Sequence, residues 1–277
     1  MTLASFFQRV AQKYLYWTSG RWCDALMQVR DTDVFLTSYP KSGNTWMRFM
    51  LADLLYGDAR AVNFDTLESL IPEVGLHSAS AIDAHAPSSE HASCLRILKS
   101  HAPLSLRFPR VIYIVRDPRD VAVSFYYYRV KRGIVSSEYP IDDHVDDFLS
   151  GLHTYGSWRE HVGGWTGARG KQASFHCLRY EDMQIDAPSA LQETAEFLGL
   201  SPSEEQIQRA VERSSADRMR SMESTSQKRK VALLQGGDDI PFVRSATSGG
   251  WEEELPPASA SKIVDAFDSL MRRFDYL

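Results

Sequence analysis

The 277-residue chain has few cysteines, no long apolar run and no excess of basic residues. Its three cysteines, Cys23, Cys94 and Cys177, are odd in number and far apart, which indicates neither a disulfide framework nor a pair of metal ligands and is typical of a reducing cytoplasm. No stretch approaches the roughly 20 apolar residues of a membrane span. The formal net charge of −5 argues against a general nucleic-acid-binding surface. Any anion site must therefore be local.

The chain is rich in apolar residues, at 43%, and this is ample for a large packed core. Short β-branched or aromatic runs predict buried strands at 34–39, 94–98, 111–115 and 174–180. Helical patterns follow several of them, including 45–56, 188–200 and 202–214. This alternation predicts an α/β fold with a central, mainly parallel sheet in a three-layer α/β/α arrangement. We treat residues 1–277 as one domain.

Four segments fit the strand–helix alternation less well. Residues 1–30 begin with an apolar pattern at helical spacing, which predicts a helix packed on the domain or, alternatively, a helix at a membrane surface. The segments 72–93, 132–150 and 223–250 are polar and lack sustained periodicity. We expect them to be long loops over the carboxyl edge of the sheet, with 223–250 as a mobile lid.

The stretch "YPKSGNTW", residues 39 to 46, joins a predicted strand to a predicted helix. A helix start leaves backbone N–H groups unpaired and carries the positive end of the helix dipole. Gly43 allows close approach of a ligand, and Lys41 adds a full charge, so the turn is suited to a phosphate or sulfate. It lacks the glycines that precede the lysine of the usual nucleotide loop. The alternative is a surface lysine and a turn glycine without a ligand.

A second strand–turn–helix pattern, "VIYIVRDPRDVAVSF", begins at residue 111. Asp117 suits a helix N-cap, and Asp120 completes a box-like arrangement, so the helix should begin near residue 117. Ser124 lies two turns along the helix, on the side where Arg116 emerges. Arg116 and Ser124 could bind a second phosphate. Alternatively, Arg116 pairs with Asp117 or Asp120.

The segment "ILKSHAPL" places His101 just beyond the end of a predicted strand, at the edge that bears the loops. An imidazole with an ordinary pKa near 6.5 suits a general base near neutral pH. Lys99 lies two residues earlier on an extended segment and points to the same side. On the residues alone, a lone histidine is more often structural or solvated.

These residues occur in the order found in one known family. With "YPKSGNTW", the segments "KSH" (99–101), "RDPRDVAVSFYY" (116–127), "YGSWREHVGGW" (155–165), "LRYEDM" (178–183) and "FVRSATSGGW" (242–251) span residues 39 to 251. The chain thereby resembles the cytosolic-type sulfotransferases, which use 3′-phosphoadenosine 5′-phosphosulfate (PAPS). The resemblance implies a P-loop-like nucleotide fold.

The resemblance also implies roles for individual residues. The 5′-phosphosulfate would bind the loop residues Lys41, Ser42, Gly43, Asn44 and Thr45. The 3′-phosphate would bind Arg116, Ser124 and Arg244, and the adenine would contact Trp46, Tyr180 and Ser214. Trp46 could instead be a core residue, and Tyr180 could merely end a strand.

The sequence departs from the family pattern in three places. Ala216 stands where the family usually has an aromatic residue near the adenine. The segment "RSA" supplies Arg244 but lacks the lysine and glycine of the usual R-K-G. The carboxyl-terminal dimer motif of many animal members is not visible after Trp251, so a monomer and a homodimer both stay open.

We expect transfer of the sulfuryl group of PAPS to a hydroxyl of a small molecule, glycan or lipid, with adenosine 3′,5′-bisphosphate (PAP) as the product. By resemblance His101 is the base, and Lys41 and Lys99 stabilise the transferring group. We expect no metal, no nucleic-acid partner and no membrane contact. The alternatives are an ATP-dependent P-loop kinase and a catalytically silent nucleotide-binding protein.

Overall fold

The structure is a computed structural model that describes residues 27–74, 79–84, 95–151, 155–226 and 240–277. A four-stranded sheet, in the order β2-β1-β3-β4, lies at its centre, and all its pairings are parallel. The strands are β1 (Asp33–Ser38), β2 (Arg96–Ser100), β3 (Arg110–Val115) and β4 (Phe175–Arg179). The predicted α/β class and parallel sheet are confirmed.

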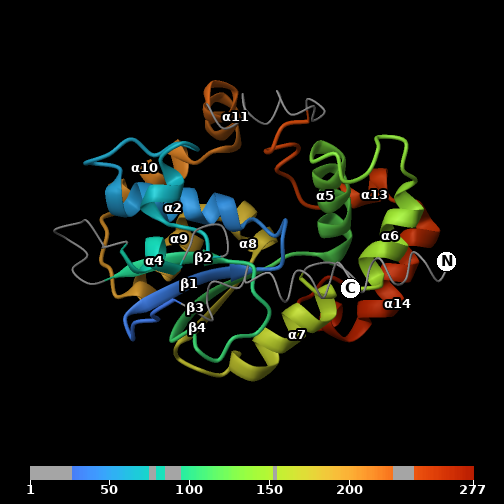
Figure 1. The fold of residues 1–277 in the computed structure, drawn as a ribbon, viewed down its shortest axis with the longest axis horizontal. Helices are drawn as coiled ribbons and strands as arrows, with labels where there is room; N and C mark the ends of the chain where they lie inside the picture. Colours follow the sequence, from blue (N-terminus) through green and yellow to red (C-terminus); the bar gives the residue numbers. More distant parts are fainter. Residues whose placement is uncertain (1–26, 75–78, 85–94, 152–154, 227–239) are drawn as a thin grey trace.

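Both faces of the sheet are covered by helices (Figure 1). Side chains alternate along a strand, so Val34 and Leu36 of β1 join one buried cluster and Phe35 joins the other. The first cluster lies under α2 (Asn44–Tyr56), α8 (Tyr180–Ile185), α9 (Ala187–Leu198) and α10 (Glu204–Arg213). The predicted three-layer arrangement follows from this double burial.

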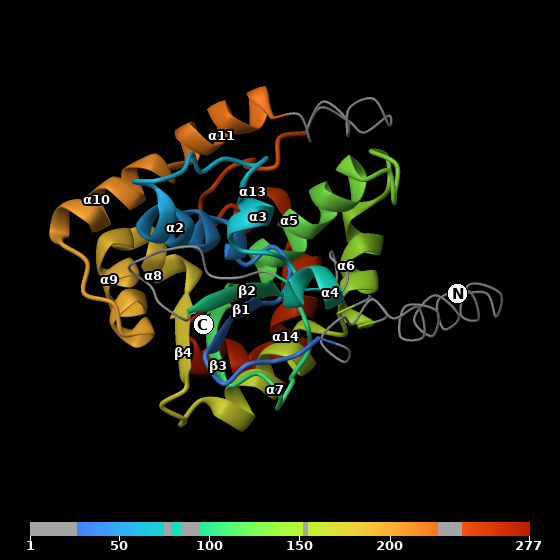
Figure 2. The same cartoon turned by 60° about the vertical axis from the view of Figure 1, so that its left-hand side comes forward.

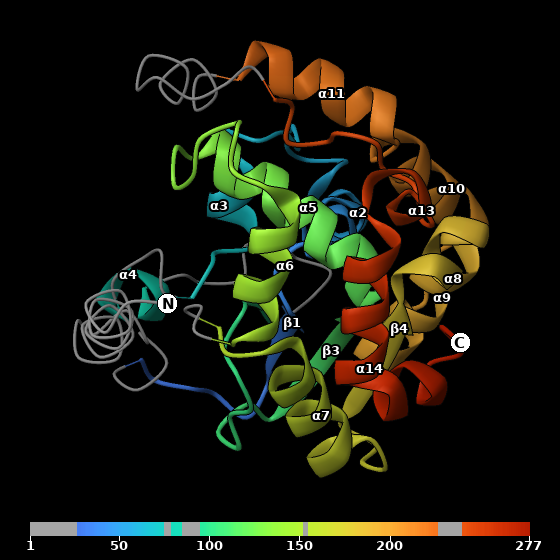
Figure 3. The same cartoon turned by 90° about the vertical axis from the view of Figure 1, so that its right-hand side faces the viewer.

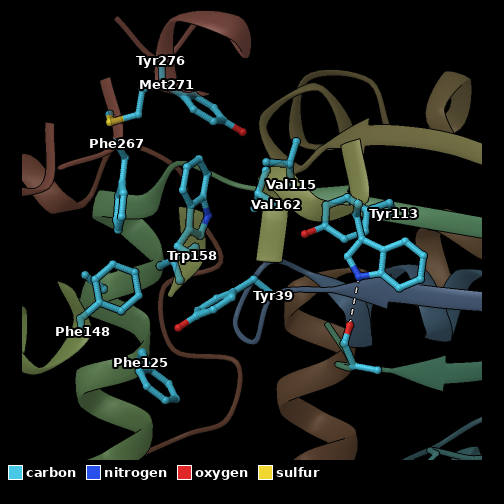
Figure 4. Close-up of a cluster of buried hydrophobic side chains, with 14 of the residues drawn as sticks. Tyr39, Tyr113, Val115, Phe125, Phe148, Trp158, Val162, Phe267, Met271 and Tyr276 are labelled. Atoms are coloured by element: carbon cyan, nitrogen blue, oxygen red, sulfur yellow. Dashed lines mark hydrogen bonds between the residues drawn. The ribbon is translucent and has the colours of Figure 1, made fainter. Parts of the chain in front are cut away.

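The second cluster is rich in aromatic residues and lies under the helices of the opposite face. These are α5 (Pro118–Lys131), α6 (Ile141–Leu149), α7 (Trp158–Arg169) and α14 (Pro257–Arg273). Figure 3 shows α5, α6 and α14 side by side. Figure 4 shows Tyr39, Phe148, Trp158 and Phe267 gathered between these helices and the sheet.

Four further helices lie in the described ranges. They are α3 (Leu67–Leu70), α4 (Ala79–Asp83), α11 (Ala216–Thr225) and α13 (Trp251–Glu254). Figure 2 shows α11 continuing outward from the end of α10. None of the helices in the described ranges combines the length and apolar character that a membrane crossing requires.

Several expectations for single segments need correction. Residues 132–150 include α6, because Val145 and Phe148 pack on the core at helical spacing. Residues 72–93 include α4. Residues 27–30 are not helical, and residues 1–26 of the predicted amino-terminal helix lie outside the described residues.

The helix after β3 begins at Pro118, as predicted, with the Asp117 side chain accepting a hydrogen bond from the Arg119 backbone N–H. The predicted box at Asp120 does not form. Its carboxylate instead accepts from the backbone N–H groups of Gly249 (2.8 Å) and Trp251 (3.2 Å). In the segment 223–250, residues 223–225 belong to α11, 240–250 form neither helix nor strand, and 227–239 lie outside the described residues.

A buried ion pair fixes the start of β1 against β2. Asp33 and Arg96 are register partners, and their side chains are fully buried. The Arg96 guanidinium donates twice to the Asp33 carboxylate, at 2.8 and 2.6 Å, and also to the carbonyls of Gln28 and Ile82. Removing one charge would leave the other buried without compensation, which is costly.

We therefore predict that Asp33→Asn lowers the free energy of unfolding by about 3–5 kcal/mol, measured by denaturant titration. The exposed α14 pair of Asp268 with Arg272 (3.0 Å) is the matched control, and Asp268→Asn should cost less than about 1 kcal/mol. Similar losses in the two variants would contradict a structural role for the buried pair.

Candidate active site

The carboxyl ends of the parallel strands lie at one edge of the sheet and carry the predicted site residues. Lys41 follows β1, His101 follows β2, Arg116 follows β3, and Tyr180 follows β4. The chain after β1 runs through α2 toward β2, whereas β3 lies on the other side of β1. The end of β1 is therefore a topological switch point, where α/β proteins form their ligand crevices.

The loop after β1 has an unusual backbone. Lys41 has φ +71° and Gly43 has φ +91°, and a left-handed conformation at a non-glycine residue such as Lys41 is uncommon and is enriched at functional sites. Helix α2 begins directly afterwards at Asn44, and no side chain caps its first turn. The Ser42 hydroxyl is buried without a hydrogen-bond partner in the described structure. These donors fit the predicted anion loop.

The close approach of Gly43 to Tyr180 explains why a glycine is needed in the loop. A Cβ at position 43 would lie 2.4 Å from Cδ2 of the Tyr180 ring. That ring also lies 4.3 Å below the Arg116 guanidinium and packs edge-on against Trp46, with centroids 6.0 Å apart. Tyr180 thus joins the first loop to the second.

The Lys41 ammonium lies over two aromatic rings, 4.8 Å from the Phe242 centroid and 5.3 Å from that of Tyr128. Desolvation, together with repulsion from Arg116, Lys131 and Lys99, lowers the pKa of Lys41 to about 7. An anion bound in the loop would favour the charged amine and raise this pKa. The positive charge of Lys41 is therefore not balanced by a nearby negative charge in the unliganded loop.

Arg116 is buried and spans the two loops. Its guanidinium donates to the backbone carbonyls of Lys41 (3.1 Å) and Thr247 (2.9 Å), and its Nε has no partner in the described part of the chain. The alternative pairing with Asp117 is not formed, because Asp117 pairs with Arg119 at 2.6 Å. Arg116 and Ser124 line the same cavity, as their spacing predicted.

His101 is oriented by the end of β1. Its Nδ1 lies 2.8 Å from the Ser38 carbonyl oxygen, and since a carbonyl only accepts, Nδ1 carries the proton. In the neutral ring Nε2 then holds the lone pair. Desolvation and the Lys99 charge lower the pKa of His101 to about 3, so the imidazole is neutral at pH 7. This is the protonation state of a general base.

A second, buried histidine contacts the backbone of His101. His161 Nε2 lies 3.3 Å from the His101 carbonyl oxygen, and its Nδ1 lies 2.8 Å from the Tyr113 hydroxyl. Burial lowers the pKa of His161 to about 4, so it is neutral, donating through Nε2 and accepting from Tyr113. The segment "YGSWREHVGGW" thus holds the backbone of the proposed base.

Lys99 lines the cavity beside His101, but its ammonium pairs with Glu73, 2.6 Å away. The sequence pattern does not mark Glu73 as a site residue, because Glu73 lies in a polar segment without periodicity. Glu73 comes to lie beside Lys99 because its segment pairs with β2: the backbone N–H of Val74 donates to the Lys99 carbonyl at 2.8 Å.

Residues 240–251 form a strap along one side of the cavity. The Glu223 carboxylate accepts from the backbone N–H of Phe242 (2.7 Å), and Arg220 donates to the carbonyls of three strap residues, Val243, Arg244 and Ser245. The Arg244 guanidinium makes two hydrogen bonds to Glu254, of 3.1 and 2.7 Å. A phosphate at Arg244 would have to compete with this carboxylate.

The site residues surround a cavity of about 540 Å³. It is lined by these predicted residues: Lys41, Gly43, Asn44, Thr45, Trp46, Lys99, His101, Arg116, Ser124, Tyr180 and Arg244. Ser42 and Ser214 are buried and are not among its lining residues. Ala216 and Met219 line the wall next to Ser214.

Comparison with known proteins identifies the family. The model of the sulfotransferase domain matches residues 31–275. The chain belongs to the sulfotransferase family. It is similar to mouse sulfotransferase 2B1, with 31% identity over 254 residues that cover 88% of this chain and 71% of the relative. It is also similar to mouse sulfotransferase 1E1, with 28% identity and coverage of 88% and 84%.

Solved structures of sulfotransferases share the fold. Retinol dehydratase in complex with androsterone and PAP aligns with a TM-score of 0.74 at 24% identity, covering 92% of this chain and 85% of that one. A mouse sulfotransferase complexed with PAP aligns with a TM-score of 0.69 at 23% identity, covering 92% and 90%. The predicted enzyme class, a PAPS-dependent sulfotransferase, is confirmed.

We predict that Gly43→Ala lowers PAP affinity by at least about tenfold, or 1.4 kcal/mol, because the new methyl group must displace the Tyr180 ring. Isothermal titration calorimetry measures this. Gly199→Ala is the matched control, since Gly199 also has positive φ (+76°) but nothing within 4 Å of a new Cβ. It should lose only about 1–2 kcal/mol of stability. Unchanged affinity in Gly43→Ala would contradict the steric account.

Proposed function

We propose that this sulfotransferase transfers the sulfuryl group of PAPS to a hydroxyl group of a small, largely apolar acceptor. One observation carries the proposal: the Lys41 loop, Arg116 and His101 reach a single cavity from three neighbouring strand ends. A phosphosulfate donor needs the first two, and a hydroxyl acceptor needs the third. A glycan or a lipid headgroup with a free hydroxyl is the more polar alternative.

The two cationic loops support a donor with two separated phosphates. The Lys41 loop would hold the 5′-phosphosulfate, with donors from the start of α2. Arg116 and Ser124 would hold the 3′-phosphate, and Trp46 and Tyr180 would flank the adenine. PAP is present in the related retinol dehydratase and mouse sulfotransferase structures.

The reaction requires positioning and charge stabilisation rather than a covalent enzyme intermediate. The acceptor oxygen forms a bond to sulfur while the bond from sulfur to the 5′-phosphate oxygen breaks. His101 Nε2 takes the proton of the acceptor hydroxyl. Lys41 stabilises the negative charge that develops on the departing phosphate oxygen. Lys99 stabilises the transferring sulfuryl group.

The low basicity of His101 in the unliganded cavity is compatible with this role. Desolvation and the positive charge of Lys99 lower the pKa of His101. A bound phosphosulfate places negative charge beside Lys41 and Lys99, which favours imidazolium and raises the His101 pKa. The donor would thus increase the strength of the base that acts on the acceptor.

The cavity has aromatic walls. Phe125, Tyr128, Tyr155 and Phe242 line it together with His101, and the Tyr155 ring packs edge-on against His101 with centroids 5.8 Å apart. Such walls favour a flat or apolar acceptor with one hydroxyl directed at His101. Androsterone and retinol occupy complexes of the structural relative retinol dehydratase.

The donor is tested by ligand-induced thermal stabilisation. PAP should raise the unfolding temperature more than ADP at equal concentration, because only PAP supplies a phosphate to Arg116 and Ser124. A chelator should leave the PAP shift unchanged, whereas the alternative of an ATP-dependent kinase predicts a magnesium-dependent ADP shift. Equal shifts for PAP and ADP would contradict the two-anion assignment.

The acceptor is then sought by transfer of labelled sulfate from PAPS to a panel of phenols, aliphatic alcohols, sterols and glycolipids. With an acceptor in hand, we predict that His101→Ala lowers kcat by about 10²–10⁴-fold, while the calorimetric Kd for PAP changes little.

His176→Ala is the control for the loss of an imidazole, since His176 packs on Phe197 and does not line the cavity. It should keep kcat close to that of the unaltered enzyme. Substantial turnover by His101→Ala at every pH would remove His101 from the role of base.

A further inference from the structure

A carboxylate lies within the cationic end of the cavity. Glu73 lines the cavity with Lys99 and His101, and its Oε2 lies 2.6 Å from Lys99 Nζ. The Lys99 side chain is 11% exposed and the Glu73 side chain 24%, so the lysine is buried and its partner is half-buried. Such a short, charge-assisted hydrogen bond fixes the direction of a flexible lysine side chain.

The backbone places Glu73 beside Lys99. Glu73 and Lys99 form a parallel bridge next to β2: Lys99 N–H donates to the Pro72 carbonyl at 2.9 Å, and Val74 N–H donates to the Lys99 carbonyl at 2.8 Å. A buried side chain of α2 anchors the preceding residues. The Arg48 guanidinium donates to the Ile71 carbonyl and pairs with Glu68 at 2.9 Å.

We propose that Glu73 is a positioning residue of sulfuryl transfer, which holds the Lys99 ammonium at the acceptor end of the cavity and maintains its positive charge until the donor binds. This proposal rests on the proposed function. Glu73 itself need not touch the donor or the acceptor. When the sulfuryl group arrives, its oxygens offer Lys99 a second acceptor beside the carboxylate.

The charges around Lys99 explain why such a residue is needed. Burial lowers the pKa of Lys99, and the positive charge of Arg48 lowers it further, whereas Glu73 opposes both by its charge and its hydrogen bond. The other titratable groups that face Lys99 are Glu68 on α3, Lys41 in the first loop and His101 beyond β2.

Glu73 is in the ionised form that this role requires. Burial raises the pKa of its carboxyl group, but the charge and hydrogen bond of Lys99, together with His101 and Arg48, outweigh the burial and leave the pKa below the ordinary value. Without Glu73, Lys99 would be a buried amine among Lys41 and Arg48. It would then lose its proton at a lower pH.

The test is the pH dependence of kcat/KM for PAPS in the unaltered enzyme and in Glu73→Gln. Lys99 is protonated below its pKa, and removing Glu73 lowers that pKa. The kcat/KM of the unaltered enzyme divided by that of Glu73→Gln should therefore be constant at low pH. It should grow roughly tenfold per pH unit between the Lys99 pKa of the variant and that of the unaltered enzyme. Glu73→Asp should restore part of the loss.

A second background separates charge from structure. An arginine stays charged at every working pH. In an enzyme that carries Lys99→Arg, the ratio of kcat/KM without Glu73→Gln to kcat/KM with it should therefore be independent of pH. Asp147→Asn is the control for loss of an ion-paired carboxylate outside the cavity, since Asp147 pairs with Arg129 at 3.0 Å. It should not alter the pH profile.

The outcomes are distinct. Loss by Glu73→Gln that is uniform across pH, or no loss at all, overturns the proposal, provided that PAP still stabilises the variant against heat. If Glu73→Gln does not fold, the profile of Glu73→Asp decides, because a carboxylate set back by one methylene should still move the alkaline limb to lower pH. Failure of the unaltered enzyme to transfer sulfate would instead refute the proposed function.

Discussion

The crowding of positive charge at one end of a shielded cavity is the constraint on which the site depends. Arg116 and Lys99 repel the Lys41 charge there, and Arg48 repels that of Lys99, which adds to the cost of removing the two lysine charges from water. The protein offsets this cost locally: Glu73 pairs with Lys99, two backbone carbonyls accept from Arg116, and aromatic faces receive Lys41. The remaining imbalance, seen in the low pKa of Lys41, favours an incoming anion.

The sheet makes this crowding possible with little irregular structure. Parallel pairing aligns the strands so that Ser38, Ser100 and Val115 end at the same edge. Each strand then contributes one functional residue immediately beyond its end. Because β1 lies between β2 and β3, its loop contacts both neighbours: the Ser38 carbonyl orients His101, and the Lys41 carbonyl accepts from Arg116.

The sequence predicted those parts of the site that directly follow strands. "PKSG", "KSH" and "RDPRD" each sit at the junction of an apolar run and a turn, where pattern and chemistry coincide, so Lys41, His101 and Arg116 could be placed at one edge before the fold was known. Helix α5 was predicted to start near residue 117 for the same reason: its N-cap and proline are local features. Their catalytic and binding roles stay predictions.

Features that depend on contacts between distant segments could not be predicted in this way. Asp120 suggested a local capping box, yet its carboxylate binds backbone N–H groups about 130 residues away in the chain, at Gly249 and Trp251. Glu73 lies in a polar stretch that resembles a loop, and only a parallel bridge to β2 brings it to Lys99. Helix α6 was missed because it is only nine residues long and lies in a polar stretch, although Ile141, Val145, Phe148 and Leu149 recur at helical spacing.

The carboxylates near the cavity share a physical role that follows from the same constraint. Glu73 pairs with Lys99, Glu254 with Arg244, and Glu223 with Lys131. Each carboxylate forms an ion pair with a cationic side chain in the unliganded protein. A bound anion must therefore share that cation with the carboxylate or replace the carboxylate as its partner. A tight, fully satisfied pair would resist that exchange, whereas an unpaired buried lysine would lose its proton. The carboxylates keep the neighbouring cations charged, whereas the Lys41 loop has no carboxylate partner among the described residues. The cavity therefore stays positively charged and can still bind an anionic donor.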